Sequence, residues 1–363
     1  MSILEDLNHA PVDKFRKLEI KSLDPSKELE DPNCRIWTIM PDGTHIAHPP
    51  VPEDTEELME VTKRLPEVLP GALNALEGLR SVHWTITKDN SDWIQSTVLR
   101  FLRSLLPSAL DPRKRDTSQS TGSLQTLIIR SEKSLDPTDF VSSLAAVLIH
   151  NPYLTHLELN MEEQLEKQLP FRNLIQNVPP ETIHPHFLLL RGWSIEVTPE
   201  MRHHLTSLHS LQLPRSWSRV QPSHEEFWKS LTIIVPPSLR YVSAGWVSDG
   251  LLDFLQSIPG LDDLELGYAG GYTDQESDRL ARRFYNDVLP QHRRSLRRLH
   301  VYPAFTGSWT IGLPDVDVFD GCVELTRLAV GLDPDEILPG AMGEGDVVVR
   351  LQLDNDMLRA REY

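Results

Sequence analysis

Paired cysteines, long apolar runs and Asn-x-Ser/Thr acceptors are all missing from this 363-residue sequence. Cys34 and Cys322 are far apart and have no neighbours at metal-ligand spacing, which excludes a disulfide framework and a cysteine-based metal site. No segment approaches the roughly 18 apolar residues of a membrane helix, and the first residues lack the basic and apolar regions of a secretory signal. These absences predict a cytoplasmic or nuclear protein without a membrane partner.

Basic residues are also scarce, because 36 Lys and Arg stand against 53 Asp and Glu, for a formal net charge of -17. The acidic excess is concentrated in residues 1–70 and 312–363. Such a balance disfavours nucleic acid as a partner. We therefore expect a protein partner and no nucleic acid.

One spacing, in contrast, occurs again and again: an aliphatic anchor, two free residues, a second aliphatic residue, one free residue and a third. It is found in residues 79–86, 124–129, 154–159, 208–213, 239–244, 261–266, 296–301 and 325–330. A degenerate copy, Phe187-Leu-Leu-Leu190, falls in the longest gap. Self-similarity of this kind indicates a repeat architecture.

Helical patterns separate these strand-like segments. Residues 92–106, 138–150 and 249–258 have apolar residues at helical spacing and end at proline or glycine. Ser223-His-Glu-Glu226 and Thr273-Asp-Gln-Glu276 match the capping box and predict helices that end near Pro236 and Pro290. Strands that each follow a helix must run parallel. The prediction is an α/β leucine-rich-repeat solenoid, a horseshoe with a parallel sheet on the concave face and helices on the convex face.

The expected organisation has three parts. Residues 1–57 form an N-terminal segment with strand-like stretches at 15–20 and 35–39, followed by an acidic, proline-rich exposed loop over 40–57. The solenoid occupies residues 58–331. Residues 332–363 form a C-terminal cap, because the strict alternation of apolar residues over 347–353 is typical of a strand that covers the last repeat.

Partner-binding residues are sought at the free positions inside each repeat, since side chains alternate across a strand and these positions face the concave surface. Exposed Tyr and Arg are enriched in binding hot spots. The candidates are His156, Glu158, Tyr241, Asp263, Glu265, Tyr268, Arg297, Arg298, His300 and Tyr302.

Catalytic and metal sites are not expected. The sequence lacks Gly-x-Ser-x-Gly, a phosphate-binding loop and His-Glu-x-x-His. Five histidines lie close together in the sequence, but a zinc site needs about four converging ligands and both cysteines are distant. A cluster of arginines around Arg279 and Arg283 is expected to form a solvated helix face, paired with Asp278 and Asp287. We expect no cofactor and no metal.

The repeats over residues 60–331 resemble the leucine-rich-repeat superfamily. Leu69-Pro-Gly-Ala-Leu-Asn-Ala-Leu-Glu-Gly-Leu-Arg-Ser-Val-His-Trp84, with Ser91-Asp-Trp-Ile-Gln95, resembles fungal F-box/leucine-rich-repeat-like proteins. That resemblance implies a solenoid that recruits a protein, with a cullin-type ubiquitin ligase as a further partner. Two departures are evident: the asparagine that follows each strand in the family is mostly missing, and no F-box is seen.

Leu65-Pro-Glu-Val-Leu69 is similar to the opening of an F-box helix, but Pro70-Gly71 interrupts it, so it is predicted to be the first convex helix. The expected function is a non-enzymatic protein-interaction module, with F-box-like substrate recognition implied by the resemblance. Two alternatives stay open: an enzyme with a pocket between the N-terminal segment and the solenoid, and a degenerate paralogue without its effector module.

Overall fold

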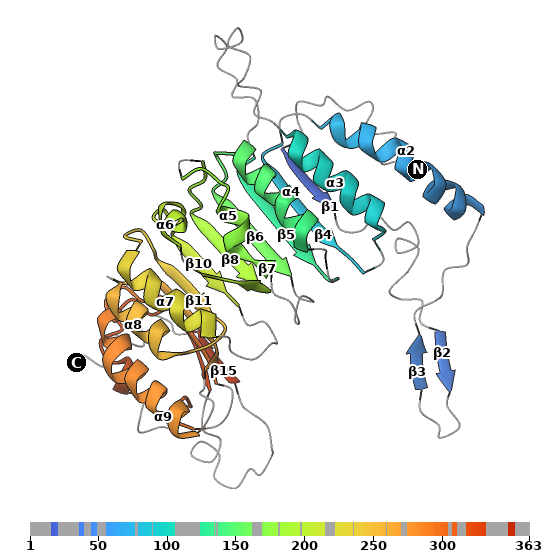
Figure 1. The fold of residues 1–363 in the computed structure, drawn as a ribbon. Coiled ribbons are helices and arrows are strands. Elements are labelled where there is room, and N and C mark those ends of the chain that lie inside the picture. Colours follow the sequence, from blue (N-terminus) through green and yellow to red (C-terminus); the bar gives the residue numbers. More distant parts are fainter. Residues whose placement is uncertain are drawn as a thin grey trace. The chain divides into compact units, whose positions relative to one another are not determined.

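The fold is α/β with a mostly parallel sheet (Figure 1). The computed structural model describes residues 16–20, 36–39, 45–48, 56–76, 79–88, 90–105, 124–133, 135, 137–161, 169–180, 182–196, 198–214, 222–234, 236–258, 260–269, 274–303, 307–310, 317–331 and 348–352. The chain divides into two compact units, unit 1 (Met1–Asn151) and unit 2 (Pro152–Tyr363).

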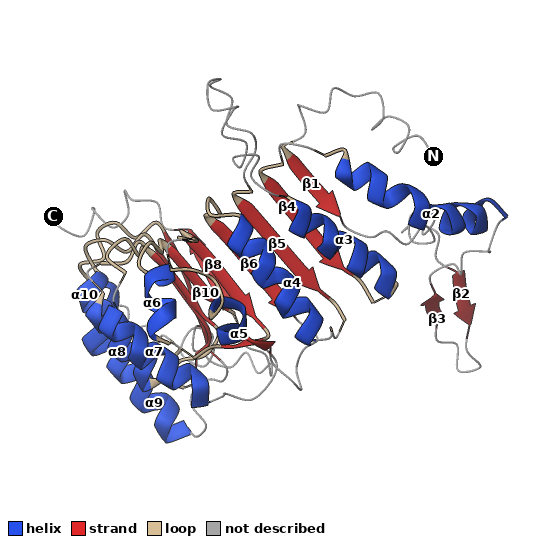
Figure 2. Ribbon diagram, turned by 45° about the horizontal axis from the view of Figure 1, so that its top comes forward, coloured by secondary structure: helices blue, strands red, loops and turns tan. Residues whose placement is uncertain are grey.

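Unit 1 contains a parallel sheet in the order β1 (Lys17–Ile20), β4 (Ser81–Ile86) and β5 (Thr126–Ser131). Helices α2 (Glu56–Asn74), α3 (Asp92–Ser104) and α4 (Pro137–His150) lie on one face of this sheet (Figure 2). The Arg103 guanidinium of α3 donates to the Ser143 hydroxyl of α4, which links neighbouring helices. A separate antiparallel hairpin consists of β2 (Ile36–Ile39) and β3 (His45–His48).

Unit 2 contains a longer sheet, in which every neighbouring pair is parallel except the last pair, β14 and β15. Its strands, in spatial order, are β6 (His156–Met161), β8 (Phe187–Arg191), β10 (Ser210–Leu213), β11 (Tyr241–Ala244), β12 (Asp263–Ala269), β13 (Arg298–Pro303), β14 (Arg327–Gly331) and β15 (Val348–Gln352). Two short strands, β7 (Leu169–Pro170) and β9 (Trp193–Ser194), pair with each other.

The helices of unit 2 lie together on one face of its sheet (Figure 2). They are α5 (Phe171–Ile175), α6 (Pro199–Leu205), α7 (Pro222–Ile234), α8 (Asp249–Ser257), α9 (Asp274–Arg283), the π-helix η5 (Phe284–Val288) and α10 (Leu289–His292). We call the opposite face of this sheet, to which the non-core positions of β6 to β14 point, the open face.

Burial explains why the repeated spacing produces this arrangement. Every anchor of the spacing is buried, from Leu79 in unit 1 to Val330 in unit 2, and these side chains point toward the helices. Intervening positions alternate to the other side of the sheet, as the alternation of half-buried and buried residues in β4 and β10 illustrates. The predicted strand at 187–190 is confirmed as β8, with Leu188 and Leu190 in the core.

A backbone ladder joins the turns that precede the strands of unit 2. The Thr155 carbonyl oxygen accepts hydrogen bonds from the amides of His186 and Phe187, and the His186 carbonyl accepts from the next turn and strand. The same two-amide pattern continues through His209, Arg240, Asp262 and Arg297. Each turn is thereby held in register with the next, so residues far apart in sequence become neighbours.

One proline position was interpreted wrongly. Helix α2 continues through Pro66 and Pro70, although Pro70-Gly71 was expected to interrupt it. A proline inside a helix removes one backbone donor, and much of α2 is exposed, so water can replace the lost hydrogen bonds. The helix that was expected to end near Pro290 ends at His292, two residues beyond that proline.

The π-helix η5 accommodates Pro290. The amide of Leu289 donates to the carbonyl of Phe284, five residues earlier, so the helix widens ahead of the proline. Proline has no N–H to donate and its ring clashes with the carbonyl four residues before it, and a wider turn relieves that clash. The chain then continues as α10 to His292.

Two further expectations need correction. His45–His48 is strand β3, and α2 begins at Glu56, so residues 40–57 are not loop throughout. Helix α7 begins at Pro222, ahead of Ser223, so Ser223 is not the residue before the helix that a capping box requires. The expected strands at 15–20, 35–39 and 347–353 are confirmed as β1, β2 and β15, whereas the boundaries at residues 57 and 331 stay predictions.

Candidate functional site

The open face of unit 2 brings most of the candidate binding residues together in two rows across the strands. The register aligns His156, Phe187, Ser210, Tyr241, Asp263, Arg298 and Arg327 in the first row. It aligns Glu158, Leu189, Gln212, Ser243, Glu265, His300 and Ala329 in the second. Seven of the ten predicted residues therefore occupy neighbouring positions on one surface.

At the centre of this surface, charged and polar groups are paired across strands. The guanidinium of Arg298 on β13 binds both carboxylate oxygens of Asp263 on β12, with Nε 2.5 Å from Oδ1. The phenol of Tyr241 on β11 donates to Glu265 Oε2 at 2.9 Å. Burial first, and the charge of Glu265 next, raise the pKa of Tyr241 well above its ordinary value. The phenol therefore stays protonated and remains a hydrogen-bond donor.

Glu158 and the three predicted residues outside the two rows are less well placed to contact a partner. Glu158 is only 7% exposed, so little of it is available to a partner. Arg297 is exposed but lies in the turn before β13, outside the two rows. Tyr302 lies two residues beyond His300 on the same side of β13, and their rings meet edge to face at 6.0 Å. Tyr268 belongs to β12, and its side chain lies outside the described residues.

Phe187 and Leu189 are open-face residues that were not among the predicted ones. Both are half-buried, and the Phe187 ring stacks on the His156 imidazole with centroids 3.9 Å apart and an interplanar angle of 4°. The sequence indicated these two residues, because the side chains of Phe187-Leu-Leu-Leu190 are apolar on both faces of the strand. A strand with one polar face would not show that pattern.

The arginine cluster is paired, although with different partners from those expected. Arg279 and Arg283 on α9 bind Asp249 at the start of α8, with Arg279 Nη1 2.8 Å from Oδ1, and Arg283 also reaches Asp253. The hydrogen bond from Arg279 is the main reason that the pKa of Asp249 is lowered. Asp278 instead accepts a hydrogen bond from the Ser308 amide. These arginines therefore link helices.

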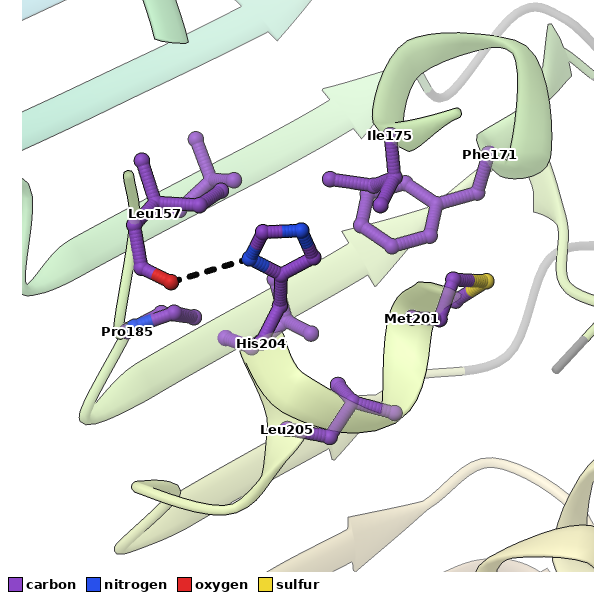
Figure 3. Close-up of a pocket in the computed structure, with 9 residues that line it drawn as sticks. Leu157, Phe171, Ile175, Pro185, Met201, His204 and Leu205 are labelled. Carbon is purple, nitrogen blue, oxygen red and sulfur yellow. Dashed lines mark hydrogen bonds between the residues drawn. The ribbon is translucent and has the colours of Figure 1, made fainter. Parts of the chain in front are cut away.

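A small cavity lies between the sheet and helices α5 and α6 in unit 2 (Figure 3). Its volume is about 10 Å³, and its lining is apolar except for His204, as in Leu157, Phe171 and Met201. A cavity of this size holds about one water molecule, whereas ligand pockets are typically hundreds of Å³. It is too small for a metabolite.

His204 is the polar group in that cavity. Its Nδ1 donates to the Ile183 carbonyl oxygen at 3.0 Å, shown as a dashed line in Figure 3, and its Nε2 has no hydrogen-bond partner among the described residues. Burial, with smaller contributions from the charges of His184 and His203, lowers the pKa of His204. The imidazole is therefore neutral at pH 7, and as one titratable group in an apolar cavity it forms no catalytic constellation.

Within the described parts of the chain, no group of three or more His, Cys, Asp or Glu side chains is placed to hold a metal ion. No helix in those parts is long and apolar enough to span a membrane. Known protein-family models do not match this sequence, and no curated protein is significantly similar to it.

Proposed function

We propose that this chain is a leucine-rich-repeat solenoid that binds a protein partner across the open face of unit 2 and catalyses no reaction itself. In this proposal the sheet lines the concave side of a horseshoe and the helices form its convex side. The repeated helix-and-strand unit, the buried anchors and the two-amide turn ladder support a repeat protein.

One observation carries the choice of surface: Phe187 and Leu189 present large apolar side chains on a mostly polar sheet face. Their register neighbours are His156, Ser210 and Gln212, so the apolar pair sits within a polar surround. Apolar and aromatic anchors enclosed by polar residues are the usual composition of a protein-binding hot spot. Tyr241 and Arg298, on strands farther along the sheet, supply further residue types that are enriched there.

The pairing of charged groups on this face indicates which residues would supply the affinity for a partner. Arg298 and Asp263 already neutralise each other, and so contribute less net attraction than isolated charges would. The apolar pair would supply most of the affinity, and the paired polar groups would select complementary hydrogen bonds. Substitution of Phe187 or Leu189 is therefore the sharpest test of the surface.

The cellular setting belongs to the same proposal. The resemblance to F-box/leucine-rich-repeat-like proteins supports a substrate-recognition role beside a cullin-type ubiquitin ligase. The sparse cysteines support a cytoplasmic or nuclear location. The proposed ligase association rests on the resemblance, whereas the proposed binding surface rests on the residues of the open face. The two parts are therefore tested separately.

The test compares Leu189→Arg on the open face with Ile233→Arg on α7. Ile233 is 72% exposed, so the control places the same new charge on the helix side. Partners are isolated with the tagged chain from its own cells and identified by mass spectrometry, then purified for titration with each variant. Binding by the Leu189→Arg variant should weaken at least about tenfold, while the Ile233→Arg variant should bind normally.

The unfolding midpoint of each variant must match that of the original chain, so that a loss of binding cannot be caused by a loss of folding. A partner bound equally by both variants would remove the open face from the proposal. Recovery of the ligase adaptor with a client would support substrate recognition, whereas a client without the adaptor would support a scaffold. Failure to recover any partner under conditions that preserve the fold would contradict the binding function.

A further inference from the structure

His186 and His209 lie side by side at the entrances to two neighbouring strands of unit 2. His186 immediately precedes β8 and His209 immediately precedes β10. The amide of His209 donates to the carbonyl oxygen of His186 at 2.8 Å, so the turn ladder keeps the two residues adjacent. Both side chains are exposed, and their ring centroids are 4.9 Å apart with an interplanar angle of 50°. Two imidazoles 23 positions apart in the chain thus meet at the surface.

The hydrogen bond made by His209 leaves its other ring nitrogen able to bind a metal. Nδ1 of His209 lies 2.9 Å from the Ser207 carbonyl oxygen. A carbonyl oxygen only accepts hydrogen bonds, so Nδ1 carries the proton and Nε2 carries the lone pair. A histidine that ligates a metal usually donates its other N–H to a carbonyl or carboxylate in this way. The ring of His186 is exposed and contacts the ring of His209.

We propose that His186 and His209 form a two-histidine site for a divalent transition-metal ion of the Zn²⁺ and Cu²⁺ class. With metal–nitrogen bonds of about 2.0–2.1 Å, two imidazoles at neighbouring coordination positions have ring centroids roughly 4.5–5.2 Å apart. The observed separation of 4.9 Å falls inside that interval. Imidazole is a preferred ligand for both ions, and Cu²⁺ binds such ligands more tightly than Zn²⁺ does.

The surroundings define the rest of the site. No third His, Cys, Asp or Glu among the described residues is placed to complete a cluster, so the described residues supply two ligands and leave the other coordination positions to other donors. Water, or a donor from a bound molecule, would fill them. Arg240, in the next turn of the ladder, donates through Nη1 to the Leu239 carbonyl oxygen at 3.0 Å, which directs its guanidinium toward its own turn.

This site is independent of the proposed protein partner, because it uses two turn residues and no open-face side chain. Its test uses the purified full chain with Cu²⁺ and electron paramagnetic resonance, which reports nitrogen ligands directly. One equivalent of Cu²⁺ should bind with two nitrogen donors. His186→Ala and His209→Ala should each lose one donor and weaken binding at least about tenfold. His203→Ala, which removes another exposed histidine of unit 2, should bind as the original chain does.

A second measurement needs no variant. Zn²⁺ should protect His186 and His209, but not His203, from modification by diethyl pyrocarbonate, as read by peptide mapping. Unchanged Cu²⁺ affinity and nitrogen count in the His186→Ala/His209→Ala double variant would overturn the proposal, because the ion would then sit elsewhere. Equal modification of the three histidines with and without Zn²⁺ would overturn it as well.

Discussion

Glu225 of α7 accepts a hydrogen bond from the backbone N–H of Gly250, in the first turn of α8, and both carboxylate oxygens lie 3.0 Å from that nitrogen. Ser248, the residue before α8, accepts a hydrogen bond from the Leu251 amide through its hydroxyl. The start of α8 is therefore capped twice, once from its own chain segment and once from the preceding helix. An anion at this position also interacts favourably with the helix dipole.

Removal of the Glu225 carboxylate should destabilise unit 2. Glu225→Ala leaves the Gly250 amide without its acceptor, and loss of a cap of this kind costs about 1–2 kcal/mol. The measurement is chemical denaturation at pH 7, with Glu226→Ala as the matched control, because Glu226 is mostly exposed and pairs with Lys229 on its own helix. An equal loss of stability in the two variants would show that the effect is one of net charge and not of capping.

The same carboxylate predicts a pH dependence. Burial raises the pKa of Glu225, but hydrogen bonds from Ser248 and Gly250, together with Lys229, outweigh it and lower the pKa overall. A carboxyl whose folded pKa is depressed stabilises the fold above its unfolded pKa and loses that contribution as pH falls. The difference between the original chain and Glu225→Ala should therefore shrink as pH is lowered below about 4.5.

Gly250 should resist substitution for a steric reason. A Cβ at this position would lie 2.8 Å from the backbone carbonyl oxygen of Glu225, closer than real Cβ atoms approach backbone. The clash should outweigh the gain in helix propensity, so we expect Gly250→Ala to lower the free energy of unfolding by about 1–3 kcal/mol.

Gly71 provides the matched control on α2. It also lies within a helix, but a Cβ added there would meet no atom within 4 Å, so Gly71→Ala should raise the free energy of unfolding by about 0.5–1 kcal/mol. Opposite signs for the two Gly→Ala changes in denaturant titrations are the expected outcome. Stabilisation by Gly250→Ala would mean that α7 and α8 are not packed so closely.

The strand positions could be predicted because the repeat pattern is local. Leu208, Leu211 and Leu213 are buried on one side of β10, as their spacing indicates, and the register then follows from aligning successive repeats. The same alignment of repeats places Asp263 beside Arg298, although 35 positions separate them. Their bidentate pairing required only that adjacent strands be in register.

Contacts between helices could not be predicted in the same way. Arg279 and Arg283 bind Asp249 rather than Asp278 or Asp287, because the packing of α8 on α9 decides which carboxylate is within reach. The pairing of His186 with His209 similarly depends on the turn ladder. Its hydrogen bonds join backbone atoms, so they leave no pattern of residue types in the sequence. Local spacing indicated the sheet, whereas the choice of partners among exposed charges required the three-dimensional packing.

His292 of α10 should make unit 2 sensitive to acid. The side chain is fully buried, its Nδ1 accepts a hydrogen bond from the Leu261 amide at 3.2 Å, and its Nε2 donates to the Leu255 carbonyl oxygen at 3.1 Å. Both bonds require the neutral imidazole with its proton on Nε2. Burial lowers the pKa of His292 from 6.5 to about 4, even though the bond to Leu255 opposes the shift.

A histidine with a depressed folded pKa stabilises the fold above its unfolded pKa, and that contribution is lost as pH falls. Between pH 6.5 and about 4 the unfolded chain takes up a proton at His292 that the folded chain does not, so stability should fall by on the order of 3 kcal/mol across this interval. His292→Gln keeps one acceptor and one donor without a titrating group, so its denaturation free energy should change less between pH 7 and pH 4.5. His150→Gln, at an exposed position of α4, should keep the full dependence. An identical pH profile for His292→Gln and the original chain would mean that His292 does not remain neutral in the folded protein.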